Sequence, residues 1–100
     1  GYIPDSFGHT AQIPQLLRGF GIDTALVWRG FGGEPGQEGS EYRWRSPDGS
    51  EVLMEHLSDA GYSAAYFNDP APEAARARFD DVRRRVDPRA TTPERLVLSG

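Results

Sequence analysis

The sequence contains no cysteine and no lysine, and it has only two histidines, His9 and His56. Without cysteine there can be no disulfide framework and no metal site built from thiolates. No apolar run approaches the roughly 20 residues of a membrane-spanning helix, so we expect no membrane partner. The net charge of −4 disfavours a nucleic-acid-binding surface, because such surfaces are normally basic.

One hundred residues can form at most one small domain. Residues 1–3 and 96–98 both have the apolar character of buried strands without flanking turns, which is unusual at the ends of an intact domain. We therefore expect residues 1–100 to be an internal segment of a single catalytic domain, cut at both ends. We interpret the exclusive use of arginine as the bias of a GC-rich genome, and we expect a bacterial, cytoplasmic protein.

Residues 2–10 bring a carboxylate, a glycine and an imidazole into one short turn. Pro4 favours an extended conformation at Ile3 and places Asp5 just beyond a strand. Because sites in parallel α/β folds lie at that end of the strands, Asp5 is a candidate catalytic carboxylate. A solvated turn residue is the simpler alternative. His9 and Asp5 alone are too few for a catalytic zinc site, so we interpret His9 as a packed, hydrogen-bonded histidine.

Strand, helix and strand are predicted in succession over the first 28 residues, as in a βαβ unit. The helix would span about residues 10–20, with Thr10 as its N-cap and Gly21 as a left-handed cap. Its apolar stripe consists of Ile13, Leu16, Leu17 and Phe20. The strand at residues 24–28 is apolar throughout most of its length, which is typical of a parallel sheet. Arg29 would then emerge beside Asp5, unless it is an ordinary surface arginine.

Residues 41–46 and 51–57 are predicted to form a β-hairpin around a turn at residues 46–50, which contains Pro-Asp-Gly. We expect this hairpin to decorate the parallel core rather than to form part of it. Tyr42 and Trp44 alternate with arginines, so they either pack within the hairpin or stack on a sugar. His56 and Glu55 are an unfavourable pair of metal ligands, because adjacent strand residues point to opposite faces.

The remaining sequence predicts a second helix and a final strand. The helix would begin at Asp69 as its cap and end before Asp87-Pro88. Its predicted buried stripe consists of Ala75, Phe79, Val82 and Val86. The final strand would cover residues 96–98.

Four motifs stand near the N-terminus: Pro4-Asp5-Ser6-Phe7-Gly8-His9, Gln12-Ile13-Pro14-Gln15-Leu16-Leu17, Gly19-Phe20-Gly21-Ile22 and Trp28-Arg29-Gly30. With these motifs in this order, the sequence resembles glycoside hydrolase family 38, the retaining α-mannosidases. Weaker matches follow at residues 44–49 and 96–100. The resemblance implies an α/β fold, namely part of a seven-stranded (β/α) barrel with parallel strands, into which the predicted hairpin is inserted.

The resemblance also implies an activity, a retaining and zinc-dependent hydrolysis of terminal α-mannosides or mannose-containing oligosaccharides. Asp5 would be both the nucleophile and a zinc ligand, whereas Arg29 and Tyr62 would contact the substrate. The family's other zinc ligands, a His-x-Asp pair and a distant histidine, do not occur among these residues. The family's acid/base follows the strand that resembles residues 96–100. We therefore expect the rest of the catalytic domain to be a necessary partner, and this segment to be inactive alone.

Two alternatives to an α-mannosidase segment remain at this point. The chain could be a non-enzymatic segment or domain that keeps the fold without the activity. A weaker alternative is a metal-dependent polysaccharide deacetylase, which shares a seven-stranded barrel but needs a His-x3-His pair that this sequence lacks. A reading frame with His-x-Asp upstream and a carboxylate beyond Gly100 would favour the enzyme.

Overall fold

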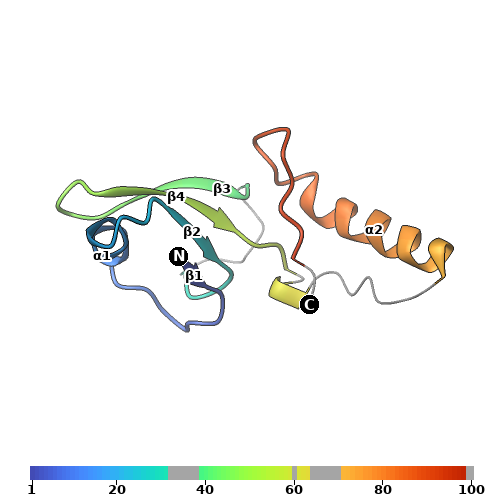
Figure 1. The fold of residues 1–100 in the computed structure, drawn as a ribbon, viewed down its shortest axis with the longest axis horizontal. Coiled ribbons are helices and arrows are strands. Elements are labelled where there is room, and N and C mark those ends of the chain that lie inside the picture. The colour runs from blue at the N-terminus through green and yellow to red at the C-terminus, as the bar shows by residue number, and fades with distance from the viewer. Residues whose placement is uncertain (32–38, 60, 64–70, 99–100) are drawn as a thin grey trace.

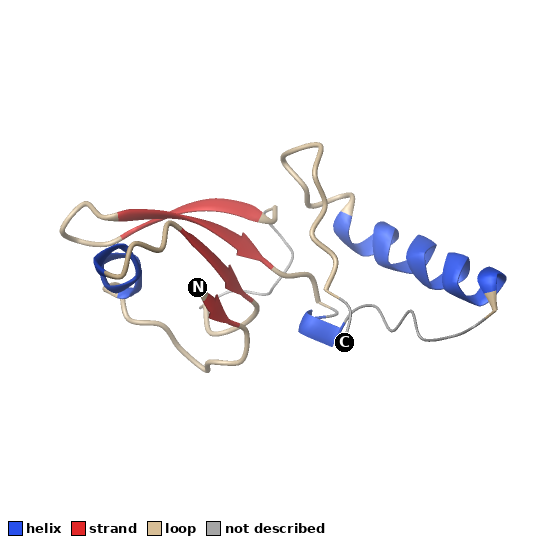
Figure 2. Ribbon diagram, viewed as in Figure 1, coloured by secondary structure: helices blue, strands red, loops and turns tan. Residues whose placement is uncertain are grey.

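The computed structural model describes residues 1–31, 39–59, 61–63 and 71–98. Within these ranges the chain folds into a mixed α/β structure in which a four-stranded sheet carries one short helix and a longer helix lies apart (Figures 1 and 2). The elements in chain order are β1 (Tyr2–Ile3), α1 (Ile13–Gly19), β2 (Thr24–Val27), β3 (Glu41–Arg45), β4 (Glu51–His56), η1 (Gly61–Ser63) and α2 (Pro72–Val86). Among the helices of these ranges, none is both long and apolar enough to cross a membrane.

The sheet has the strand order β1-β2-β4-β3. β1 pairs with β2 in parallel, with Tyr2 opposite Leu26, so the predicted strand–helix–strand unit is confirmed. β2 also pairs in parallel with β4, where Thr24 lies opposite Leu53. Only β3 runs antiparallel, as the partner of β4 in the predicted hairpin. The described residues contribute four strands, so the seven-stranded barrel stays a prediction.

The prediction that the hairpin only decorates the fold is wrong, because β4 lies inside the sheet between β2 and β3. Val52 and Met54 on β4 join Ala25 and Val27 on β2 in the hydrophobic core. The alternation of buried and exposed residues along β4 turns this face toward α1. Tyr42 and Trp44 on β3 pack against the same core, so the hairpin-packing interpretation of this aromatic pair is confirmed.

α1 is shorter than predicted, and it begins after Gln12 rather than at Thr10. It ends in the predicted left-handed glycine, because Gly21 has a φ of 73° and donates to the Arg18 carbonyl. Leu17 packs on the core, but Leu16 and Phe20 are exposed, so the predicted apolar stripe is only partly correct. A helix of two turns covers only part of the sheet, and the buried Pro14 takes one of its inward positions.

α2 differs from its prediction in its N-cap and in the residues that it buries. Its N-cap is Ala71, whereas the predicted cap, Asp69, lies outside the described residues. Val82 is buried as predicted, but Phe79 is 46% exposed. Residues 96–98 form no strand in the described part of the chain; they run as an extended segment beside Val82 and line a small cavity with it.

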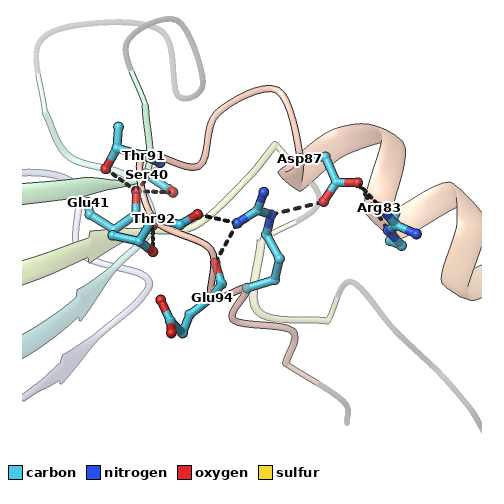
Figure 3. Close-up of polar contacts among 8 residues, drawn as sticks. Ser40, Glu41, Arg83, Asp87, Thr91, Thr92 and Glu94 are labelled. Carbon is cyan, nitrogen blue, oxygen red and sulfur yellow. Dashed lines mark hydrogen bonds and ion pairs between the residues drawn. The ribbon is translucent and has the colours of Figure 1, made fainter.

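Hydrogen bonds to Glu41 on β3 fasten the segment after α2 to the sheet (Figure 3). The Glu41 carboxylate accepts from the Thr91 amide at 2.8 Å, from the hydroxyls of Thr91 and Thr92 at 2.7 and 2.9 Å, and from Ser40 at 2.8 Å. Partial burial raises the pKa of Glu41, but these donors outweigh it and hold the pKa at about 2. We call this group of four residues the Glu41 clasp.

Candidate functional site

Asp5, Arg29 and Tyr62 all follow the carboxyl ends of neighbouring parallel strands. Asp5 lies two residues beyond β1 and Arg29 two residues beyond β2, whereas Tyr62 lies on η1 after β4. Since β1, β2 and β4 are adjacent in the sheet, their carboxyl ends meet at one edge. Binding and catalytic residues gather at this edge in parallel α/β folds.

Asp5 and Arg29 form an ion pair at this edge, in which the Nη2 group of Arg29 donates to Oδ1 of Asp5. The prediction that the two side chains share one end of the sheet is therefore confirmed. The Asp5 side chain is 51% exposed and that of Arg29 35% exposed. The arginine thus fixes the orientation of a carboxylate that remains open to solvent on its other side.

Two aromatic rings hold the Arg29 guanidinium. Its central carbon lies 4.3 Å from the centroid of the Phe7 ring and 4.9 Å from that of the Trp28 ring. Such cation–π contacts are attractive and favour one placement of the arginine. Phe7 is 87% exposed, so its ring is available beside the ion pair. The sequence analysis assigned no role to Phe7 or Trp28. Their positions close to Asp5 and Arg29 in the sequence could have indicated that they contact the ion pair.

Tyr62 belongs to the same aromatic group through Trp28. Their ring centroids are 5.4 Å apart and their planes are nearly perpendicular, at 88°. Tyr62 is 39% exposed. Gly61 makes this contact possible, because a Cβ atom there would lie 2.8 Å from the Trp28 ring. The structure thus brings all three predicted site residues together, Tyr62 by way of Trp28.

Gly30 allows the loops after β1 and β2 to approach each other closely. Its φ of 96° is strained for any residue with a side chain. A Cβ atom at this position would lie 2.6 Å from the Ser6 carbonyl oxygen and 2.9 Å from Nε2 of His9. The contact distance between the Asp5 and Arg29 loops therefore depends on the absence of a side chain here.

Both histidines are hydrogen-bonded to main-chain oxygens rather than arranged as metal ligands. His9 Nε2 lies 2.7 Å from the Arg29 carbonyl oxygen, and His56 Nε2 lies 2.7 Å from that of Trp28. The interpretation of His9 as a packed, hydrogen-bonded histidine is confirmed. Burial lowers the pKa of His56, aided by the positive charge of Arg89 and opposed by the bond to Trp28.

The described residues do not complete a zinc site. No group of three His, Asp, Glu or Cys side chains that could hold a metal occurs among them. Asp5 can offer a carboxylate oxygen to a metal, because an oxygen that accepts one hydrogen bond from Arg29 keeps a second lone pair. A catalytic zinc needs about three protein ligands. Asp5 can therefore be one ligand of such a zinc, and the described residues do not supply the other two.

A small, partly open cavity of about 20 Å³ lies away from these residues, beside α2. Glu55, Arg89 and Val82 are among the side chains that line it, but Asp5, Arg29 and Tyr62 are not. Burial raises the pKa of Glu55, as does the nearby charge of Glu41, while Arg89 opposes them. The cavity is large enough for about one water molecule. It is too small for a sugar, so the cleft expected at Asp5 stays a prediction.

The fold and the site together define an α/β domain that places its polar chemistry on loops at the carboxyl edge of parallel strands. A model of the N-terminal domain of glycosyl hydrolases family 38 matches residues 1–100. The chain therefore belongs to glycosyl hydrolases family 38. This membership removes the deacetylase alternative.

Individual relatives agree with this assignment. The chain is 34% identical to an alpha-mannosidase of Saccharomyces cerevisiae over 73 residues, which make up 68% of this chain. It is 40% identical to a putative mannosylglycerate hydrolase of Halalkalibacterium halodurans over 63 residues, or 53% of this chain. The crystal structure of an alpha-mannosidase from Enterococcus faecalis V583 matches 100% of this chain with a TM-score of 0.84 and 27% identity.

The chain spans only a small part of these relatives. It covers 6% of the yeast protein, 7% of the Halalkalibacterium protein and 11% of the chain in the crystal structure. The activity of the whole protein is therefore a matter of proposal.

Proposed function

We propose that the chain is the segment of a retaining, zinc-dependent α-mannosidase that carries the nucleophile. The observation that supports this most directly is the half-exposed Asp5 carboxylate, oriented by Arg29 at the carboxyl edge of the parallel strands. Family membership and the relatives named alpha-mannosidase support mannosides as substrates. Arg29 and Tyr62 are proposed to contact the bound sugar.

In the proposed reaction, one oxygen of the Asp5 carboxylate attacks the anomeric carbon of the mannoside. The bond from that carbon to the leaving oxygen breaks while the bond to Asp5 forms, and a second carboxyl group gives its proton to the leaving oxygen. In the second step, the second carboxylate takes a proton from water, whose oxygen bonds to the anomeric carbon while the bond to Asp5 breaks. In retaining enzymes the two carboxyl groups are about 5–5.5 Å apart, and we propose that the second comes from outside these 100 residues.

The other oxygen of the Asp5 carboxylate would be a ligand to the zinc that the family resemblance implies. That metal, when bound, serves to hold the 2- and 3-hydroxyls of the sugar and to help distort the ring. The remaining ligands would come from other parts of the domain.

The test is the substitution Asp5→Asn in the complete parent protein. Turnover of an aryl α-mannoside should fall by several orders of magnitude, because an amide is neither an anionic ligand nor an effective nucleophile. A fluorinated mannosyl donor should trap a covalent adduct on Asp5 in the unmodified protein. Asp23→Asn is a matched control, because Asp23 precedes β2 at the opposite end of the sheet. An adduct on any other carboxylate would refute the role of Asp5.

A second candidate substrate is mannosylglycerate, which shares the mannosyl group and differs in the leaving group. The identity of 40% to a putative mannosylglycerate hydrolase favours testing it. Comparison of kcat/KM for mannosylglycerate and for a mannose disaccharide would separate the two. If the parent protein hydrolyses neither substrate nor the aryl mannoside, the non-enzymatic alternative applies.

A further inference from the structure

The two histidines bind consecutive carbonyl groups at the end of β2. His9 contacts the Arg29 oxygen and His56 the Trp28 oxygen, each through Nε2 at 2.7 Å. A carbonyl oxygen can only accept, so Nε2 must carry the proton in both rings. The two donors come from different parts of the fold, since His9 follows β1 and His56 ends β4.

The rings of both histidines are themselves held in place by Phe31. His9 stacks on Phe31 with centroids 4.7 Å apart, and His56 meets the same ring edge-on at 5.6 Å. Trp44 on β3 contacts both His9 and Phe31, at 5.5 and 5.4 Å. The imidazoles therefore have little freedom to rotate, and their N–H groups are oriented by packing against Phe31 and, for His9, against Trp44.

These bonds act directly on the backbone of Arg29. The peptide groups of Trp28 and Arg29 are anchored through their oxygens, and the next residue, Gly30, lies against the backbone of Ser6 and Gly8. An anchored backbone limits where the Arg29 side chain can go, and that side chain is the one that binds Asp5. His9 also lies on the Asp5 loop, so its bond ties the two loops of the site together.

We propose that His9 and His56 are positioning residues, which fix the end of β2 so that the Arg29 guanidinium orients the Asp5 carboxylate. The readout by activity rests on the proposed function above. The structural part of the proposal does not, because the placement of Arg29 can be observed directly. Neither histidine touches the reacting atoms.

The first test uses two substitutions of His9 in the complete parent protein. His9→Phe keeps a ring against Phe31 but removes the hydrogen-bond donor. His9→Gln places an amide N–H group about where the Nε2–H of His9 lies, so it can still donate to the Arg29 carbonyl. His9→Phe should lower kcat about 10- to 100-fold, because a misplacement of about 1 Å costs that much, with KM changed only a few-fold. His9→Gln should restore kcat to within a few-fold of the unmodified protein.

A double-mutant cycle then asks whether His9 acts through Arg29. In an Arg29→Met background, His9→Phe should cause no further loss of kcat. An equal loss in both backgrounds would overturn the proposal, and so would a His9→Gln variant as impaired as His9→Phe. Tyr42→Phe is a matched control, because the Tyr42 hydroxyl also donates to a carbonyl, that of Gly39, at 3.1 Å but outside β2.

Crystal structures of the same proteins provide a test that does not depend on enzymatic activity. The ion pair between Arg29 and Asp5 should be present in the unmodified protein and in His9→Gln, and displaced in His9→Phe. An unchanged ion pair in His9→Phe would overturn the proposal whatever the kinetics. If the unmodified protein shows no mannosidase activity but the ion pair responds in this way, the proposed function fails and the positioning role stands. His56→Gln, which keeps a donor in the core, should behave like His9→Gln in both arms.

Discussion

Arg29 makes three contacts at once, an ion pair with Asp5 and ring contacts with Phe7 and Trp28. A planar guanidinium can do this because its edge carries the donors while its faces remain free for stacking. An ammonium group would give up one of these contacts to make the other. The chemistry of the site therefore depends on this side chain being an arginine, and not only on its charge.

The protonation of His56 leads to a prediction about pH. Burial lowers its pKa in the folded protein below the ordinary value of 6.5, so the unfolded chain takes up a proton first as the pH falls. The contribution of neutral His56 to stability is complete above about 6.5 and is lost as the pH falls through the folded pKa. Hydrogen exchange of β4, corrected for its intrinsic pH dependence, should show less protection at about pH 5 than at about pH 7.

The control for this prediction is His56→Gln, which keeps a donor toward Trp28 but does not titrate. The pH-dependent loss of protection in β4 should disappear in this variant. Arg89 is the charged group that acts on the pKa of His56, and its Nη2 donates to the His56 carbonyl at 3.1 Å. An identical pH response in both proteins would assign the effect to another group.

Sequence alone was sufficient to place Asp5 beside Arg29, because both follow parallel strands and the ends of such strands meet. It was not sufficient to place the histidines. Each was considered separately, as a metal ligand or a packed ring, and nothing local indicates that His9 and His56 bind consecutive carbonyl groups. The orientation of an imidazole depends on residues such as Phe31, whose position is set only when the strands have assembled.

β3 holds the segment after α2 to the sheet through the Glu41 clasp. Glu41→Gln should weaken it at neutral pH, because an amide offers one acceptor oxygen where the carboxylate offers two charged ones. Hydrogen exchange of peptides covering residues 89–98 should become faster. The clasp should persist above about pH 4.5 and be lost as the pH falls toward about 2, since the folded pKa lies below the ordinary value.

Glu51→Gln is the matched control on the same hairpin. Glu51 pairs with Arg43 and Arg45, whose side chains are 83% and 70% exposed. Exposed ion pairs contribute little to stability, so exchange at residues 89–98 should not change. Equal acceleration in both variants would mean that the clasp has no special role.

At the level of elements, the β1–α1–β2 unit and the hairpin were predicted correctly, whereas the place of the hairpin in the sheet was not. The β1–α1–β2 unit and the β3–β4 hairpin follow from periodicity and turn residues, which are local signals. The position of β4 beside β2 depends on which strand edges remain free after the hairpin forms, and no local pattern encodes that. The predicted strand at residues 96–98 was wrong, because an apolar run becomes a strand only where a neighbouring strand pairs with it.

For the whole molecule, we expect the free 100-residue chain to have no mannosidase activity and only weak affinity for zinc. One carboxylate cannot act as nucleophile and as proton donor at the same time, and Asp5 offers the metal one ligand where about three are needed. The measurements are an aryl α-mannoside assay with added zinc and a calorimetric zinc titration. Turnover clearly above buffer, or sub-micromolar zinc affinity, would show that a complete site lies within these residues.

The strand order also determines which strand edges remain unpaired while the chain is being synthesised. Leu53 on β4 pairs beside Thr24 on β2, so β2 leaves the ribosome well before its partner exists. At a synthesis rate of about 5–20 residues per second, the edge of β2 that pairs with β4 stays unpaired for a few seconds. The β3–β4 hairpin closes through neighbouring residues and can form as soon as it emerges. We therefore expect a late step of assembly in which the finished hairpin docks onto the free edge of β2.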